Sequence, residues 1–267
     1  MQHVTSFMRT KPHHWGLLIR RIVRGWWYTV HLGAVALVLA LSPSTYHRDM
    51  RLSTARHLYV NTWQVLPWFT LLASLVSLVI IRIVVVTAIS YGLSHYAIEM
   101  VVRVLVLELI PLTAALFVAI RAGFQYHAAD ILAVAAKAPD DSAALQARLQ
   151  RDLVPQVLAN TFAVLSLAMV SSVVVLVLAY LVQFGFSPWG MGDYTRTVGR
   201  VFDPTVTIGF VFKTVFFGLS VAVIPTAAQL EAQRLRRARK SNVQPGAVGL
   251  LFVLFMIEAA SLLIKYI

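Results

Sequence analysis

The stretch LVLELIPLTAALFVAIRAG, from Leu105 to Gly123, is almost long enough to cross a membrane as one helix. It nevertheless carries a carboxylate at Glu108 and a proline at Pro111. A charge at the centre of a bilayer helix costs about 2.5–3.5 kcal/mol on insertion scales, so Glu108 is not expected to face lipid. The stretch therefore predicts a membrane span whose Glu108 side faces protein or water.

The composition around this stretch is that of a membrane protein. Of the 267 residues, 59% are hydrophobic and only 13% are charged, whereas soluble domains have about 25% charged residues. The net charge of +12 is carried mainly by segments between apolar runs, which favours membrane topology over nucleic-acid binding. The absence of cysteine excludes disulfides, thiolate metal sites and cysteine nucleophiles.

Five segments are long and apolar enough to span a membrane. Residues 1–65 precede them as cytoplasmic and interfacial helices, in which the apolar run Val30 to Leu41 is shorter than the roughly 20 residues of a spanning helix. The predicted fold class is all-α and polytopic, with two amphipathic interfacial helices followed by a five-span domain over residues 66–267. The spans are predicted at Leu66 to Ser90, Val101 to Ile120, Leu153 to Val182, Thr205 to Thr226 and Val248 to Ile264.

Lysine and arginine are concentrated in the connections on one side of these spans. Eight lie in residues 1–65, four in residues 121–152 and five in residues 227–246, against two in residues 183–204 and one after Ile264. Because cytoplasmic loops carry the excess of basic residues, the N-terminus is predicted in the cytoplasm and the C-terminus in the periplasm. Residues 121–152 and the basic loop 227–246 are then cytoplasmic, and the connector 183–204 is periplasmic.

The motifs of nucleotide-binding and hydrolytic enzymes are not found in the sequence. There is no G-x-x-x-x-G-K-[ST] loop, so any ATP is expected on a partner subunit and no cofactor in this chain. There is also no G-x-S-x-G elbow and no H-E-x-x-H helix. The neighbours His13 and His14 point about 100° apart on a helix and have no third ligand nearby, so no metal site is predicted. The chain is predicted not to be an enzyme, although a membrane-embedded lipid-modifying enzyme is retained as an alternative.

Three short motifs occur in the order and spacing of a known family. The residues Glu108-Leu109-x-Pro111 and Arg121-Ala122-Gly123 resemble the R-E-L-G-P...G-R-A-G segment of MlaE-type permeases, the membrane subunits of ABC transporters that move lipids with MCE proteins. Asp152 to Pro155 resembles the segment before the third span of that family, and Phe212 to Gly218 resembles its I-K-S-x-x-F-G run. The resemblance covers about residues 20 to 267.

The chain departs from these motifs at several positions. The arginine before the glutamate is Leu107 here, the glycine before the proline is Ile110, and the glycine before Arg-Ala-Gly is Ile120. Only Ala129-Asp130 remains of an A-E-L/I-G run, and the E-x-I-D-A-L segment beyond it is not recognisable. The chain therefore resembles a divergent member, which leaves open a degenerate permease half that serves as a scaffold beside an active partner.

The resemblance implies the permease subunit of an MCE-type ABC transporter in the bacterial inner membrane, which moves phospholipid or a related hydrophobic molecule. It implies three protein partners: a second permease chain in a homo- or heterodimer, a cytoplasmic ABC ATPase, and a periplasmic MCE protein. It also implies that a coupling helix within residues 121–152 docks into a groove of the ATPase. The candidate coupling residues are Asp141, Leu145, Arg148, Leu149 and Arg151.

Four charges within the spans are the candidates for the substrate path: Arg82, Glu108, Lys213 and Glu258. At 1.5 Å per helical residue, all four are predicted at a similar depth in the outer half of the membrane. Because two are positive and two negative, they can pair across helices or line a hydrated cavity that handles a lipid headgroup. Structural pairing and headgroup handling remain about equally supported by the residues alone, and the resemblance favours the cavity.

Overall fold

The computed structural model describes residues 58–125, 154–234 and 246–266, together with the single positions Trp27, His31 and Ala34. Every regular element in these residues is a helix, which confirms the all-α fold class. The segment Val30 to Leu41 apart from His31 and Ala34, all five candidate coupling residues, and residues 235–245 of the basic loop lie outside the described residues. The predictions made for those segments stay predictions.

The described helices follow one another along the chain, and residues 126–153 and 235–245, which lie outside the described part, separate α5 from α8 and α10 from α11. Their bounds are η2 (Tyr59–Trp63), α3 (Leu66–Ser90), α4 (Ser94–Met100), η3 (Val101–Leu109), α5 (Ile110–Gln125), α8 (Val154–Phe184), η5 (Pro188–Gly190), α9 (Met191–Val201), α10 (Pro204–Arg234) and α11 (Ala247–Tyr266).

Within the described residues, five helical stretches are long and apolar enough to cross a membrane, in agreement with the five predicted spans. The second stretch begins at Ser94 rather than at Val101, because α3 turns back within three residues and the helix resumes at once. Gly92 makes this turn with a φ of 73°, a left-handed conformation that favours glycine. The five stretches are Leu66–Ser90, Ser94–Ala122, Val157–Phe184, Pro204–Ala228 and Ala247–Ile264.

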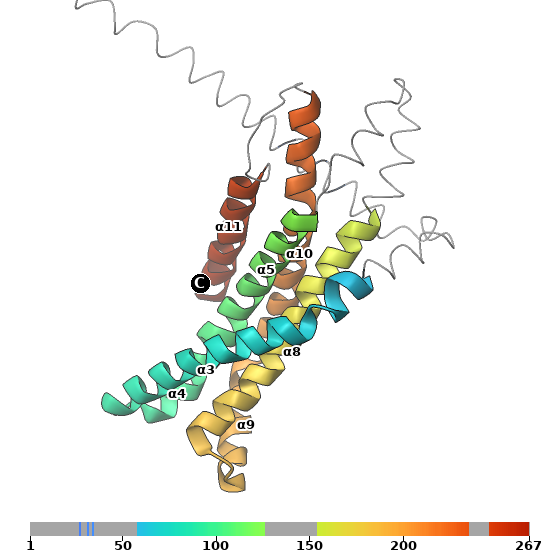
Figure 1. Cartoon of the computed structure of the whole chain (residues 1–267). Coiled ribbons are helices and arrows are strands. Elements are labelled where there is room, and N and C mark those ends of the chain that lie inside the picture. Colours follow the sequence, from blue (N-terminus) through green and yellow to red (C-terminus); the bar gives the residue numbers. More distant parts are fainter. Residues whose placement is uncertain are drawn as a thin grey trace, which may run out of the picture.

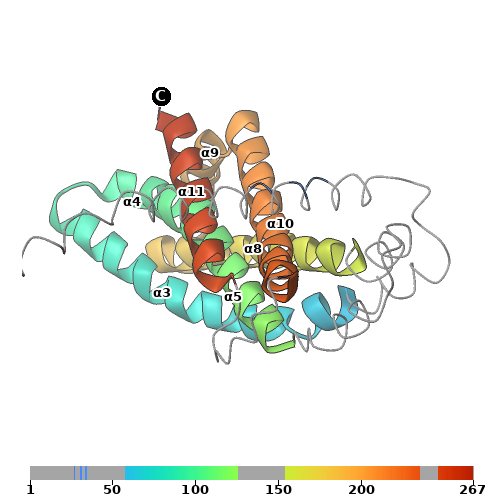
Figure 2. The same cartoon turned by 90° about the horizontal axis from the view of Figure 1, so that it is seen from above.

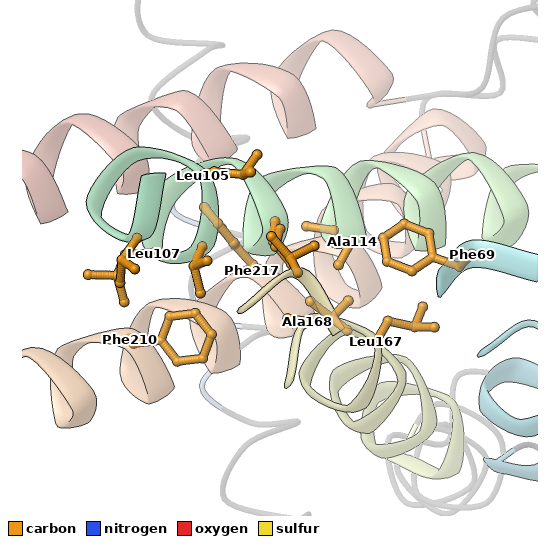
Figure 3. Packing of buried hydrophobic residues seen from close by; sticks show 14 of the residues in the cluster. Phe69, Leu105, Leu107, Ala114, Leu167, Ala168, Phe210 and Phe217 are labelled. Carbon is orange, nitrogen blue, oxygen red and sulfur yellow. The ribbon is translucent and has the colours of Figure 1, made fainter. Parts of the chain in front are cut away.

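α8 lies at the centre of the bundle. It packs against α10, α3 and α5, and α10 also packs against α5 and α11 (Figures 1 and 2). The shared core contains Phe69 of α3, Leu105 of η3, Leu167 of α8 and Phe217 of α10 (Figure 3). Apolar side chains from elements far apart in the sequence thus fix how the spans cross, since packing is the main term available for helix association in lipid.

The contact between α8 and α10 includes a very close approach of two backbones. A Cβ atom added at Gly218 of α10 would lie 2.5 Å from the Cα atom of Thr161 of α8. Small residues at such crossings allow helices in membranes to approach closely. Gly218 therefore sets the spacing of the two helices that share the largest part of the core.

α11 is the least buried of the five spans and packs mainly against α10. Its exposed side chains include Phe252, Phe255 and Met256. The polar residue Glu258 lies on the same helix and is directed to α10, where it forms an ion pair. Apolar packing on one neighbour and this ion pair together hold α11 in place.

The connector between α8 and α10 is a compact structure stabilised by aromatic residues. Tyr194 of α9 is buried, and its hydroxyl donates a hydrogen bond to the carbonyl oxygen of Leu176 at 2.6 Å. The Tyr180 ring lies 5.2 Å from the Tyr194 ring in an edge-on arrangement, and its hydroxyl donates to the carbonyl of Ser187. These contacts dock α9 onto the end of α8.

We expect this docking to weaken in alkaline solution. Burial raises the pKa of Tyr194 from 10.0 to about 12. The docked state thus prefers the neutral phenol, so the contribution of Tyr194 to stability is complete below pH 10.0 and falls as the pH rises towards about 12. Proteolysis of the connector in the wild-type protein and in Tyr194→Phe, at about pH 9 and about pH 11, measures this effect on either side of the ordinary tyrosine pKa. The wild-type advantage should shrink at the higher pH, and an unchanged advantage would contradict the role given to the hydroxyl.

Candidate functional site

A buried lysine joins three helices at one point in the bundle. Lys213 of α10 is 5% exposed, and its Nζ atom contacts Glu108 of η3 and Glu258 of α11. The Nζ atom donates a hydrogen bond to Oε2 of Glu108, donates another to Oε1 of Glu258 at 3.1 Å, and lies 3.0 Å from Oε2 of Glu258. We call Lys213, Glu108 and Glu258 the charged triad.

The backbone near Pro111 supplies the third partner of Lys213. Proline has no N–H group, so Pro111 cannot donate to the carbonyl of Leu107, four residues earlier. Lys213 donates to this carbonyl at 3.1 Å. The helix nevertheless continues past Pro111, from η3, whose turns are of the wider π type, into α5. Pro111 thus does not end the helix, and the carbonyl oxygen of Leu107 inside the span accepts a hydrogen bond from Lys213.

The triad offsets the cost of placing charges inside a membrane span. An ammonium group has three donors, and the contacts with Leu107, Glu108 and Glu258 use all of them. The Nζ atom also lies 5.9 Å from the centroid of the Phe217 ring, within the range of a cation–π contact. Charges of opposite sign that are hydrogen-bonded to one another stabilise a position that none of them would tolerate alone.

A cavity of about 600 Å³ lies next to the triad, between η3, α10 and α11. Its wall is mostly apolar and includes Glu108 and Lys213 but not Glu258. Three further polar residues stand in the wall, namely Asp203, Thr205 and Ser261. The other wall residues are Leu107, Val206, Gly209, Phe210, Phe212, Phe216, Ile257, Ala260 and Ile264. An apolar cavity with a few convergent polar groups is the usual form of a site for an amphiphilic small molecule.

The structure brings together three of the four predicted substrate-path residues. Arg82 is not with them, because its side chain is exposed on α3, and within the described residues it has no ion-pair partner. Glu99 and Arg103 lie one helical turn apart and form a separate ion pair of 2.9 Å with each other.

Three polar wall residues, Asp203, Thr205 and Ser261, were missed by the sequence analysis. Asp203 accepts a hydrogen bond from the N–H of Val206 at 2.7 Å and so caps α10. The signal was present, since an aspartate directly before Pro204 is typical of a helix start. Ser261 gave no such signal, because a serine in an apolar span has no pattern that assigns it to a cavity.

Five apolar spans and charges buried within them define an integral membrane protein. The sequence matches the family described as permease MlaE over residues 54–264, which is more than half of the chain. The chain therefore belongs to the MlaE permease family, which confirms the resemblance seen in the short motifs. A search of curated proteins found no match to the chain.

Membership of this family points to a transporter permease rather than an enzyme. MlaE permeases work as the membrane subunits of ABC transporters, together with partner permease, ATPase and substrate-binding proteins. The matched range contains all five spans, the triad and every residue of the cavity wall. The candidate site thus lies within the part of the chain that matches the family.

Proposed function

We propose that the chain is the permease subunit of an MCE-type ABC transporter, and that it moves phospholipid or a related hydrophobic molecule between the bacterial inner membrane and a periplasmic MCE protein. The observation that carries this proposal is the cavity of about 600 Å³ with the charged triad at its wall. Its apolar wall suits acyl chains, and its few polar groups suit a headgroup. Family membership supports the same function.

The position of the cavity along the spans agrees with this proposal. Asp203 and Thr205 stand where α10 begins, and Ser261 and Ile264 stand near the end of α11, so the cavity lies towards one end of the bundle. In the orientation predicted from the basic residues, with the N-terminus cytoplasmic and the C-terminus periplasmic, this end faces the periplasm. A lipid held there would be near the point of transfer to the MCE protein.

The proposed complex contains a second permease chain and cytoplasmic ABC ATPases, which bind the ATP. Residues 121–152 are proposed to contact the ATPase, through Asp141, Leu145, Arg148, Leu149 and Arg151. The triad favours substrate handling over a scaffold role, since a scaffold needs no cavity with buried charges in its wall. A lipid-modifying enzyme would need a convergent set of acids and bases, and Lys213 is fully engaged by its partners.

Neutralising the triad tests the proposal. In the complex reconstituted into vesicles, ATP-dependent transfer of a fluorescent phospholipid is measured for the variant with Lys213→Met, Glu108→Gln and Glu258→Gln. We expect the variant to assemble but to transfer lipid about tenfold more slowly, corresponding to a loss of about 1.4 kcal/mol of differential binding. The matched control is Glu99→Gln with Arg103→Met, which removes an ion pair outside the cavity. Equal transfer by both variants would refute a role of the triad in handling the lipid.

A further inference from the structure

The charged triad contains two carboxyl groups and only one ammonium group. The Nζ atom of Lys213 contacts both Glu108 and Glu258, whose side chains are 14% and 13% exposed. If both carboxyl groups were ionised, the triad would carry one net negative charge inside the bundle. Such a charge is costly there, because two carboxylates that share a poorly solvated site repel each other strongly.

The hydrogen bonds of Glu258 indicate a bound proton. Its Oε1 atom accepts from Lys213 at 3.1 Å, whereas Oε2 is buried and accepts no hydrogen bond from any described residue. A side-chain hydrogen bond nevertheless joins Glu258 to Glu108. Two ionised carboxylates offer only acceptors, so a hydrogen bond between them needs a proton on one of the two. One proton shared by the pair provides this bond and makes the triad neutral.

The other described charges are not placed to balance the second carboxylate. Asp203, the remaining charged residue of the cavity wall, is itself acidic. Glu99 and Arg103 pair with each other. Arg121 stands near the end of α5, about 20 Å along the helix from the triad at 1.5 Å per residue, and α8 contains no charged residue. The ionisable residues of α3, α4 and α9 that are exposed to the surroundings include Arg82, His95, Asp193, Arg196 and Arg200.

We propose that the charged triad is a proton-binding site, in which Glu108 and Glu258 hold one proton between them beside the ammonium group of Lys213. The bound proton links η3 to α11, while Lys213 links both of these helices to α10. The site depends on these three side chains and not on the molecule that the cavity holds. It can therefore be tested separately from the proposed function.

Release of the proton is expected to loosen α11. This helix is the least buried of the five spans and packs mainly against α10. Without the proton, the hydrogen bond between Glu258 and Glu108 is lost and the two carboxylates repel each other. Movement of α11 would change the cavity, because four residues of this helix stand in its wall: Ile257, Ala260, Ser261 and Ile264.

Carbon-13 NMR of the full chain in phospholipid vesicles tests the proton. Glutamate is labelled at its side-chain carboxyl carbon, whose chemical shift distinguishes a protonated group from an ionised one. The signals are few, because the chain contains only four glutamates: Glu99, Glu108, Glu231 and Glu258. At about pH 6 an ordinary glutamate is almost fully ionised. We expect a protonated signal equivalent to one proton per chain at this pH, and its loss by about pH 9, where lysine is still charged.

Glutamine variants separate the shared proton from a proton held elsewhere. Glu258→Gln and Glu108→Gln each remove one carboxyl group and leave the other paired with Lys213. The protonated signal should therefore disappear in both variants at about pH 6. Neither variant leaves a carboxylate without a counter-charge, so both should fold. Glu99→Gln, the control, removes a glutamate that pairs with Arg103 outside the cavity wall and should leave the signal unchanged.

Spin labels measure the link between the proton and α11. A pair of labels is attached at Ile208→Cys on α10 and Leu263→Cys on α11, which are exposed and lie five residues from Lys213 and Glu258 respectively. The distance between the labels should lengthen or spread over the same pH range in which the protonated signal is lost. With Glu258→Gln in addition, it should not change with pH, since glutamine resembles a protonated glutamate.

Each arm has a result that would contradict the proposal. Four ionised glutamates at about pH 6 would overturn the proton-binding site, and so would a protonated signal that remains in both triad variants. A signal that is still present at about pH 9, or that disappears without a change in the label distance, would overturn the coupling to α11. Lipid transfer is measured by a separate assay, so none of these results would by itself refute the proposed function.

Discussion

Replacing Lys213 with methionine is expected to destabilise the protein by about 3–5 kcal/mol, the usual cost of removing one partner from a buried ion pair. The change leaves Glu108 and Glu258 near each other with no counter-charge, in positions where their side chains are only 14% and 13% exposed. It also removes the donor to the carbonyl of Leu107. Because Glu258 connects α11 to α10 through Lys213, loss of α11 docking should accompany the loss of stability. Thermal unfolding of the purified protein in detergent measures the first effect, and accessibility of a cysteine introduced on α11 measures the second.

Removing the carboxylates together with the lysine is the informative control. The variant with Lys213→Met, Glu108→Gln and Glu258→Gln no longer buries an uncompensated charge, so it should recover a large part of the stability lost in Lys213→Met. Recovery would show that the single variant fails because of unpaired carboxylates. If the single variant were as stable as the wild type, the contacts of Lys213 would not hold α10, η3 and α11 together.

Replacing Gly218 with alanine is expected to cost about 1–3 kcal/mol, which is typical of overpacking in a well-packed interior. The added Cβ would lie 2.5 Å from Cα of Thr161, and a backbone atom cannot move aside as a flexible side chain can. α8 and α10 would have to separate, which loosens the largest helix contact of the bundle. The same thermal unfolding assay measures the loss.

Gly209 provides the control on the same helix. A Cβ added there meets nothing within 4 Å, so Gly209→Ala should leave stability near that of the wild type. An equal loss in both variants would indicate a general requirement for glycine in α10 rather than a close approach to Thr161. A valine at position 218 should be worse than alanine, since it adds two further carbons at the same crossing.

The spans were predictable from the sequence because length and apolar character alone define them. The first span has the predicted bounds, Leu66 to Ser90, the second begins at Ser94 instead of Val101, and the others differ by at most four residues at either end. Those differences arise where local turn chemistry overrides hydropathy, as at Gly92, which lets the second span begin directly after the first. The bounds of a helix thus depend on single residues, whereas a hydropathy window reports only the mean over many residues.

The triad was only partly predictable. Depth along a span follows from counting residues, which placed Arg82, Glu108, Lys213 and Glu258 in one group. Counting does not fix the direction in which a side chain leaves its helix, and adjacent residues on a helix point about 100° apart. Arg82, for example, is exposed on α3, whereas Lys213 is buried on α10.

The hydrogen bond from Lys213 to the carbonyl oxygen of Leu107 could not be predicted from the charged residues. The acceptor is a backbone carbonyl whose usual helical donor is missing at Pro111. A proline inside a helix usually breaks or kinks it, yet the helix continues past Pro111 from η3 into α5. Recognising the site required knowing that the lysine of α10 lies opposite this carbonyl, which only the packing of the bundle determines.

The most direct test of the proposed transporter is purification of the complex from the native membrane under mild conditions, with a tag at Met1 and identification of the subunits recovered with it. We expect three components in fixed proportion to this chain or its permease partner: an ATPase with a G-x-x-x-x-G-K-[ST] loop, a permease chain, and an MCE protein. The variant with Lys213→Met, Glu108→Gln and Glu258→Gln should be recovered with the same subunits, since the triad lies within the bundle. Recovery of the chain without any such ATPase would contradict its assignment as the permease subunit of an ABC transporter.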